Sequence, residues 1–223
     1  MKLYTSLLLI ALIMTGCKPD TIHIQAYSED INSVINGEII HTPVKIQFST
    51  AGSDEDNVLP KVESVIRDYI GDKGEFSITK GDWGDVVTIK YDIPMLTAKN
   101  GPEYLMNNKA PLYLGLTSQE NGYIRITLYS SKFLNDIDAL LSDLNWSLGA
   151  ELPAEETVIE ILSDSPGTVE AEAHSVFIDN TPYTIAKTEI QRRNSVSFSF
   201  VAKDGTVYHS GKNKPVIWIK INN

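Results

Sequence analysis

The feature of this sequence that most constrains its fold is a succession of short strand-like runs joined by tight turns. Residues 195–200 alternate strictly between polar and apolar side chains, as expected of a strand with one buried face. Asn-Gly pairs at 36–37 and 121–122 each lie between two such runs, and this dipeptide favours two-residue hairpin turns because both positions accept positive φ. Short hairpins predict antiparallel sheets rather than parallel strands joined by crossover helices.

Two segments follow the helical period instead. At about residues 58–70 and 131–144, apolar side chains recur every three or four positions, which predicts one apolar face on each helix. In the second segment these side chains are Phe133, Leu134, Ile137, Leu140, Leu141 and Leu144. We therefore predict an α+β fold: antiparallel sheets rich in hairpins, two packed helices at these positions, and an all-strand C-terminal part.

These patterns divide the chain into four predicted segments. A signal peptide covers residues 1–16, and a lipidated tether covers 17–22. An α+β domain follows at 23–160, and a β-rich C-terminal part occupies 161–223. The last part either stands alone or forms one domain with the part before it, since the chain is long enough for one sizeable domain or two small ones.

The N-terminus has the pattern of a secretory signal. Lys2 supplies a positive charge, residues 7–14 form the apolar run LLLIALIM, and small residues follow, which is the order found in such signals. The apolar run is much shorter than the roughly 20 residues that a membrane-spanning helix needs. Met14-Thr15-Gly16-Cys17 resembles the lipobox of bacterial lipoproteins, a resemblance that covers only residues 1–17. The alternative is an ordinary secretory signal that happens to contain a cysteine.

The lipobox resemblance implies a specific modification. In that family the cysteine sulfur receives a diacylglycerol before the signal is removed, and the new amino terminus is then usually acylated. The resemblance therefore implies a lipid on Cys17 and a protein anchored in the cell envelope. Lys18 follows where an Asp often retains Gram-negative lipoproteins in the inner membrane, so for a Gram-negative source we expect the outer membrane, facing the periplasm. Cys17 is the only cysteine, which excludes an internal disulfide.

The charge of the chain limits its partners. Its net charge is −10, which argues against DNA or RNA because phosphate binding needs a basic surface. Residues 181–223 are nevertheless basic, with seven Lys and Arg against two acids. Either this end packs beside the acidic remainder of its own chain, or it faces an anionic partner or lipid headgroups.

Sequence motifs for metal or nucleophilic chemistry fail on spacing. The four histidines, His23, His41, His174 and His209, have no second ligand at metal-binding spacing, so we expect no bound metal and no cofactor. The acids at 54–57 lack the alternating ligands of a calcium loop and instead suit the start of the helix after them. Residues 77–80 match S-x-x-K but lie in a predicted strand, where the serine and lysine point apart.

Exposed aromatic residues are the remaining binding candidates. Trp83 lies in a short turn, and Tyr123 and Tyr129 lie on the strand face opposite the core residues, a placement suited to sugar or protein contacts. The alternative is that a neighbouring loop or helix covers them. Asp82 and Asp85 are the candidate carboxylate pair for a hydrolase.

The sequence thus favours a non-enzymatic role. We expect a lipid-anchored envelope protein that presents its folded part to a protein partner. Alternatives are a phage- or mobile-element-encoded lipoprotein that blocks an outer-membrane receptor, a glycan- or peptidoglycan-binding module, and a hydrolase with an unrecognised site.

Overall fold

The computed structural model of the chain describes residues 19–49, 59–71, 74–80, 84–144, 150, 154, 156–201 and 214–222. Strands make up 54% of these residues, with four short helices between them. The strands are β1 (Thr21–Tyr27), β2 (Ile40–Ser49), β3 (Glu75–Thr79), β4 (Val86–Thr97), β5 (Leu112–Ser118), β6 (Ile124–Ser130), β7 (Glu156–Leu162), β8 (Thr168–Ile178), β9 (Thr181–Ile190), β10 (Ser195–Val201) and β11 (Val216–Asn222). The helices are α2 (Ser28–Ile35), α3 (Leu59–Ile70), α4 (Gly101–Asn107) and α5 (Lys132–Leu144).

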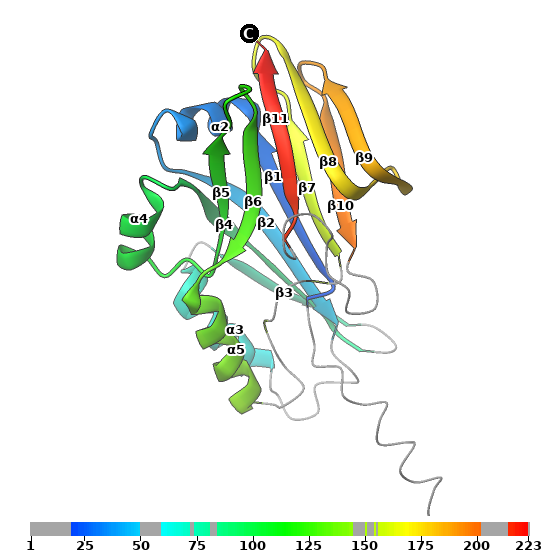
Figure 1. Cartoon of the computed structure of the whole chain (residues 1–223). Helices are drawn as coiled ribbons and strands as arrows, with labels where there is room; N and C mark the ends of the chain where they lie inside the picture. The colour runs from blue at the N-terminus through cyan, green and yellow to red at the C-terminus, as the bar shows by residue number, and fades with distance from the viewer. Residues whose placement is uncertain are drawn as a thin grey trace, which may run out of the picture.

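The strands form one sheet that closes on itself (Figure 1). Their order around the ring is β10-β7-β1-β2-β4-β5-β6-β11-β8. β8 also pairs with β10 through Phe177 and Ser199, and this last pairing closes nine strands into a barrel. β3 adds to the ring beside β4, and β9 adds beside β8. Closure gives the strands of the ring hydrogen-bonded neighbours in place of long open edges.

The predicted α+β fold, with hairpin-rich antiparallel sheets, two packed helices and an all-strand C-terminal part, is therefore wrong. Helices do form at α3 and α5, but the chain is mostly β and its strands surround a common core. Two pairs, β1–β7 and β4–β5, are parallel. The C-terminal strands β7 and β11 pair with β1 and β6, so they complete the same ring. Pairing between strands distant in the chain leaves no local pattern, because periodicity records only which side of a strand is buried.

Helix α2 replaces the hairpin predicted at Asn36-Gly37. Gly37 has a φ of +113°, and its N–H donates to the carbonyl of Val34 over 3.0 Å, so the pair ends a helix instead of turning between strands. At the other end of α2, Oδ1 of Asp164 accepts the N–H of Glu29 over 2.9 Å. The second predicted turn does connect two antiparallel strands, β5 and β6.

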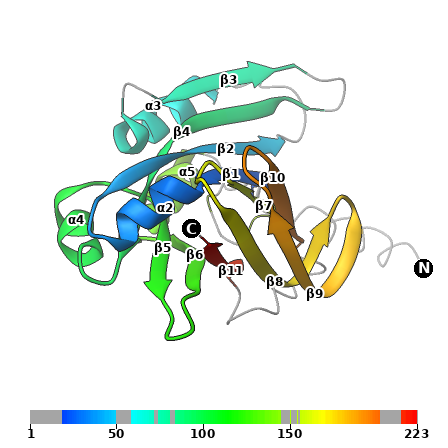
Figure 2. The same cartoon turned by 90° about the horizontal axis from the view of Figure 1, so that it is seen from above.

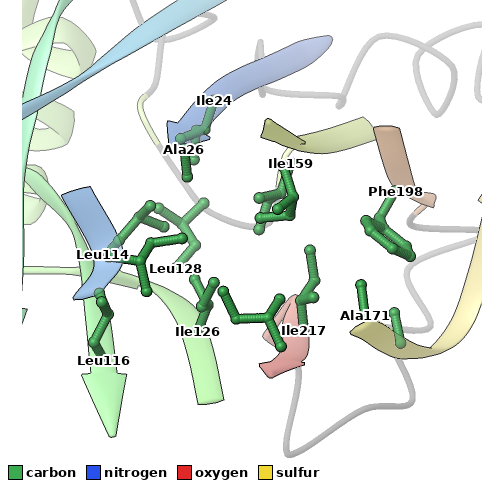
Figure 3. Close-up of a cluster of buried hydrophobic side chains, with 14 of the residues drawn as sticks. Ile24, Ala26, Leu114, Leu116, Ile126, Leu128, Ile159, Ala171, Phe198 and Ile217 are labelled. Atoms are coloured by element: carbon green, nitrogen blue, oxygen red, sulfur yellow. The ribbon is translucent and has the colours of Figure 1, made fainter. Parts of the chain in front are cut away.

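The barrel interior is filled by apolar side chains from alternate positions of its strands. Figure 3 shows them converging from β1, β5, β6, β7, β8, β10 and β11. Phe198 and Phe200 on β10 are fully buried, which confirms the alternation predicted for residues 195–200. Burying a large apolar side chain contributes roughly 1.5–3 kcal/mol, so this filled interior is the main source of stability.

Helices lie at both ends of the barrel. α2 lies across one end (Figure 2) and buries Ile31 and Val34 in the barrel core. At the other end α3 and α5 pack against the first half of β4 and form a second apolar cluster, which includes Ile66, Ile89 and Leu141. Among the described residues, no helix is long and apolar enough to cross a membrane.

Candidate functional site

A cavity of about 930 Å³ lies beside β4 and is here called the β4 cavity. The outer faces of β1, β2 and β4 form one side of it. The end of α3 with the start of β3 forms a second side, and α4 with the segment leading into β5 forms a third. The volume falls within the roughly 300–1,000 Å³ typical of ligand pockets.

The β4 cavity exists because β4 changes partners along one of its edges. β3 pairs with β4 as far as Lys90, and β5 pairs with it only from Met95. Between these points, residues 91–94 have no strand partner on that edge within the described part of the chain. The edge therefore has no neighbouring strand over these four residues, here called the uncovered stretch, and the cavity extends around it from the outer face of the sheet.

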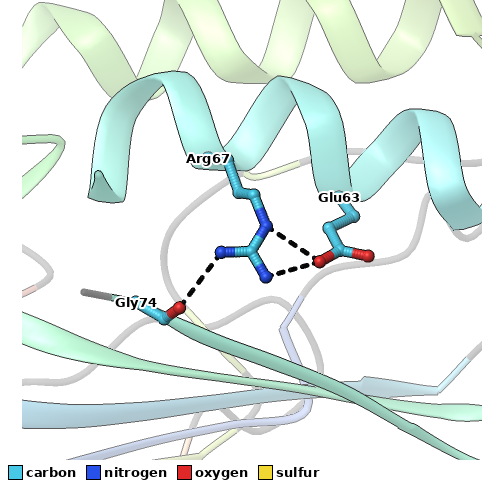
Figure 4. Close-up of polar contacts among 3 residues, drawn as sticks. All are labelled: Glu63, Arg67 and Gly74. Atoms are coloured by element: carbon cyan, nitrogen blue, oxygen red, sulfur yellow. Dashed lines mark hydrogen bonds and ion pairs between the residues drawn. The ribbon is translucent and has the colours of Figure 1, made fainter. Parts of the chain in front are cut away.

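Hydrogen bonds of Arg67 hold the cavity wall that is formed by the end of α3 and the start of β3 (Figure 4). Arg67 donates from Nε and Nη2 to Oε1 of Glu63, over 2.8 and 2.6 Å. Its Nη1 donates to the carbonyl of Gly74 over 3.2 Å. Gly71 has a φ of +71° and donates its N–H to the carbonyl of Arg67, which is a common way for a helix to end. Arg67 thus ties the segment that leads into β3 back to α3.

The α4 wall is held by a turn and by a contact to β2. Oδ1 of Asn100 accepts the N–H of Thr97 over 2.8 Å, and its Nδ2 donates to the carbonyl of Glu38 over 3.2 Å. On α4, the hydroxyl of Tyr104 lies 2.7 Å from Nε2 of His41, and both residues line the cavity. Burial raises the pKa of Tyr104, so the phenol stays neutral.

Basic side chains cross the outer face of the sheet in one row. Lys45 on β2 is the register partner of Lys90 on β4 and of His23 on β1; these three are here called the basic row. Lys90 Nζ lies 3.0 Å from Oε2 of Glu75, and His23 Nε2 lies 3.5 Å from Oε2 of Glu160. Lys45 has no such partner among the residues that the structure describes. Like charges directly opposite on neighbouring strands are destabilising, so the fold carries a cost at Lys45.

Glu160, which lies beside the basic row, is held in its charged form. Burial alone raises the pKa of Glu160, but hydrogen bonds from Gln25 and Ser195, together with the neighbouring His23, outweigh it and leave the pKa below its usual value. Gln25 Nε2 donates to Oε2 of Glu160 over 2.9 Å. The Glu160 carboxylate therefore stays charged at one end of the row.

A second, smaller space lies on the inner side of β4. It has a volume of about 50 Å³, is lined mostly by apolar side chains including Pro19, and is here called the inner gap. It lies between the barrel core and the cluster formed by α3 and α5. The β4 cavity and the inner gap share four lining residues: Ile70, Tyr91, Pro111 and Leu112. These four side chains therefore form a wall shared by the polar and the apolar space, and Tyr91 among them belongs to the uncovered stretch of β4.

The tyrosines singled out from the sequence lie elsewhere: Tyr123 directly precedes β6, and Tyr129 lies on its outer face. The hydroxyl of Tyr123 donates to Oε2 of Glu170 over 3.0 Å. Tyr129 stacks on Tyr113, with ring centroids 5.3 Å apart, and Lys214 Nζ lies 4.1 Å from the Tyr129 centroid. Both rings are in contact with neighbours from the same chain, and ligand binding through them stays a prediction.

Of the other predicted site residues, only Asp85 lies within the described part of the chain. Cys17, Trp83 and Asp82 lie outside the described residues, as does His209. Asp85, the second member of the predicted carboxylate pair, is 6% exposed, and its role stays a prediction.

The described histidines lie at two separate places. His23 and His41 line the β4 cavity. His174 lies on β8, where its Nε2 is 2.9 Å from Oε1 of Glu172 and its ring centroid is 5.0 Å from that of Trp218. In the described ranges, no three or more His, Cys, Asp or Glu residues gather in a way that could hold a metal ion.

The basic row was missed from the sequence. Each of its members lies between apolar residues in a strand, as in Val44-Lys45-Ile46, and that pattern indicates only an outward-facing side chain. The register that brings the three together joins β1, β2 and β4, and the alternation within each strand does not contain it, so only the pairing reveals it.

Comparisons of the chain with protein-family models, with curated proteins and with solved structures found no significant match.

Proposed function

We propose that this chain is a lipid-anchored protein of the cell envelope that binds a ligand in the β4 cavity without transforming it. The observation that carries the binding role is the cavity itself. Its size suits a small ligand, and polar groups converge on it beside apolar side chains, a combination common in binding sites.

The residues around the β4 cavity support binding over nucleophilic catalysis. Among its described lining residues there is no Ser, Thr or Cys side chain, and these are the commonest nucleophiles in covalent catalysis. The Tyr104 hydroxyl that meets His41 is a phenol at the rim. Three basic side chains of the cavity instead form a row on a rigid sheet, with Asp68, Glu75, Asp92 and Lys109 also in the lining, and side chains held on a sheet suit the positioning of a ligand.

The anchor rests on the lipobox resemblance at Cys17. The chain is fixed soon after this residue, since Pro19 is buried and the N–H of Asp20 donates to the carbonyl of Gln47 over 2.8 Å. β1 begins at Thr21, inside the segment predicted as a tether. With at most about 3.6 Å per residue, a lipid on Cys17 would hold the barrel close to the membrane surface.

The anchor is tested by fractionation. Wild-type protein should stay with the membranes, and Cys17→Ser should release it into the soluble fraction. A Cys17→Ser protein that remains attached to membranes would contradict lipid anchoring.

The binding role is tested on the Cys17→Ser protein, purified from the soluble fraction without detergent. Small molecules that co-purify are identified by mass spectrometry. Lys109 lines the β4 cavity, with its Nζ 5.4 Å from the Tyr69 ring centroid, so Lys109→Trp should obstruct the cavity and remove the bound compound. Glu120→Trp, in the exposed turn between β5 and β6, is the matched control and should retain it. Equal retention by both variants, or no compound in the unsubstituted cavity, would defeat the binding role.

A further inference from the structure

We propose that the ligand of the β4 cavity is a single-chain amphiphile with a negatively charged head. The head contacts the basic row, and the chain passes around the uncovered stretch of β4 into the inner gap. This inference rests on the proposed binding function and names the chemical class of its ligand.

The basic row supplies the recognition of the head. Lys90 and His23 each have an acidic neighbour, whereas Lys45 between them has no ion pair with any described residue. An anion at Lys45 would relieve its repulsion from Lys90, and hydrogen bonds to a charged group are stronger than those between neutral groups. Asp68, Glu75 and Asp92 also line the cavity, so it is Lys45, which has no acidic partner among the described residues, that favours a carboxylate, phosphate or sulfate over a neutral head.

The junction between the two spaces supplies the path for the chain. Ile70, Tyr91, Pro111 and Leu112 line both the β4 cavity and the inner gap, so a chain that passes between these four side chains goes from one space to the other. A ligand that only matched the basic row would leave this apolar junction unused. A molecule that is charged at one end and apolar at the other matches both environments and removes apolar surface from water.

The inner gap lies where the structure can widen. It separates two apolar clusters, the barrel core and the α3–α5 cluster, and α3 and α5 adjoin the strands through side chains, without the hydrogen-bond ladders that join one strand to another. A small shift of these helices enlarges the gap without breaking the barrel ladders, because packed helices can slide past their neighbours.

The position of the inner gap relative to the predicted anchor points to the same ligand class. Pro19 lines the gap and lies two residues after Cys17. At no more than about 3.6 Å per residue, a lipid on Cys17 would place this end of the barrel at the membrane surface. The apolar space would then open near the source of single-chain amphiphiles in an envelope.

The test measures binding of three probes to the full mature chain carrying Cys17→Ser, purified without detergent, by isothermal titration calorimetry. The probes are octanoate, butyrate with the same head and a shorter chain, and octyl glucoside with the same chain and a neutral head, all below micelle-forming concentrations. We expect octanoate to bind at least about tenfold more tightly than either of the others, because it alone uses both the charge and the buried methylenes.

Two variants separate the head from the chain. Lys45→Gln should weaken octanoate by about tenfold, the size expected for a lost hydrogen bond to a charged group, and leave octyl glucoside unchanged. Ile70→Gln, at the junction, should reduce octanoate binding to the level of butyrate. Lys99→Gln is the matched control, because Lys99 is exposed in the turn before α4 and does not line the cavity. Urea unfolding of each variant shows whether its fold is intact.

Several results would overturn the inference. Equal affinity for butyrate and octanoate would make the cavity a simple anion site, and equal affinity for octyl glucoside would remove the role of charge. Octanoate binding that Lys45→Gln leaves unchanged would reject the basic row as its contact. Failure of all three probes while another compound co-purifies would reject the amphiphile and leave the binding function in place.

Discussion

Gly115 on β5 offers a sharp test of the packing on the outer face of the barrel. A Cβ built on this glycine would lie 2.5 and 2.8 Å from Cε2 and Cδ2 of the Tyr129 ring. Moving the Tyr129 ring would break contacts, because the ring stacks on Tyr113 and Lys214 Nζ lies 4.1 Å from its centroid. We therefore predict that Gly115→Ala destabilises the fold by displacing Tyr129.

The magnitude follows from the contacts that Tyr129 would lose. An aromatic pair contributes about 0.5–1.5 kcal/mol beyond its buried area, and an exposed cation–π contact contributes about 0.5–1 kcal/mol. Replacing Gly by Ala gains about 0.4–1 kcal/mol, because the unfolded chain becomes less flexible. The free energy of unfolding should fall by about 1 kcal/mol in Gly115→Ala.

The decisive measurement repeats Gly115→Ala in a variant that lacks the Tyr129 ring. In a Tyr129→Ala background the added methyl meets no ring, so Gly115→Ala should raise the free energy of unfolding by about 0.4–1 kcal/mol. Urea unfolding of the four proteins, followed by tryptophan fluorescence, gives the coupling energy of the pair. An equal effect of Gly115→Ala in both backgrounds would refute the close approach of Tyr129 to the strand.

Three other predictions use the same unfolding measurement. Phe198→Ala should lower the free energy of unfolding by about 3–5 kcal/mol by opening a cavity in the barrel core, and a loss below about 1 kcal/mol would contradict its burial. Lys45→Gln should raise stability by about 0.2–1 kcal/mol, because it removes repulsion from Lys90 on the neighbouring strand; lower stability would show that Lys45 has a stabilising partner. Asp164→Ala removes the acceptor of the Glu29 N–H and should cost about 1 kcal/mol, which an unchanged midpoint would contradict.

The lowered pKa of Glu160 gives a prediction for acid pH. A carboxylate whose pKa is lower in the fold than in the unfolded chain adds stability above its unfolded pKa. That stability is lost as the pH falls through the lowered value. Glu160→Gln should therefore flatten the decline of the free energy of unfolding across this range, and an unchanged slope would show that Glu160 does not contribute.

Local pattern was reliable where burial has a simple period. Ile124, Ile126 and Leu128 on β6 face the barrel core, and the outward tyrosines lie on the opposite face, as the alternation predicted. The helices α3 and α5 lie within a residue or two of the predicted positions. Each of these features depends on backbone geometry within one element, so a window of a few residues contains the information.

Local pattern failed where the same dipeptide suits two different structures. Asn36-Gly37 predicted a hairpin, yet Gly37 ends α2, because positive φ suits a helix end as well as a two-residue turn. The contact that fixes the start of α2 comes from Asp164, which is far away in the chain. No reading of the segment alone could distinguish the two outcomes.

The sequence by itself indicated most of the strands, which of their faces are apolar, and where α3 and α5 lie, but it missed α2 and α4; the anchor at Cys17 stays a prediction. Only the tertiary structure decided that the strands close into a barrel, that β4 keeps an uncovered stretch, and that Lys45 lies between Lys90 and His23. The physical reason is that periodicity within a strand records its orientation toward the core, whereas its neighbours are selected by packing between distant segments. The candidate site is made of such neighbours, so it appears only once the barrel is closed.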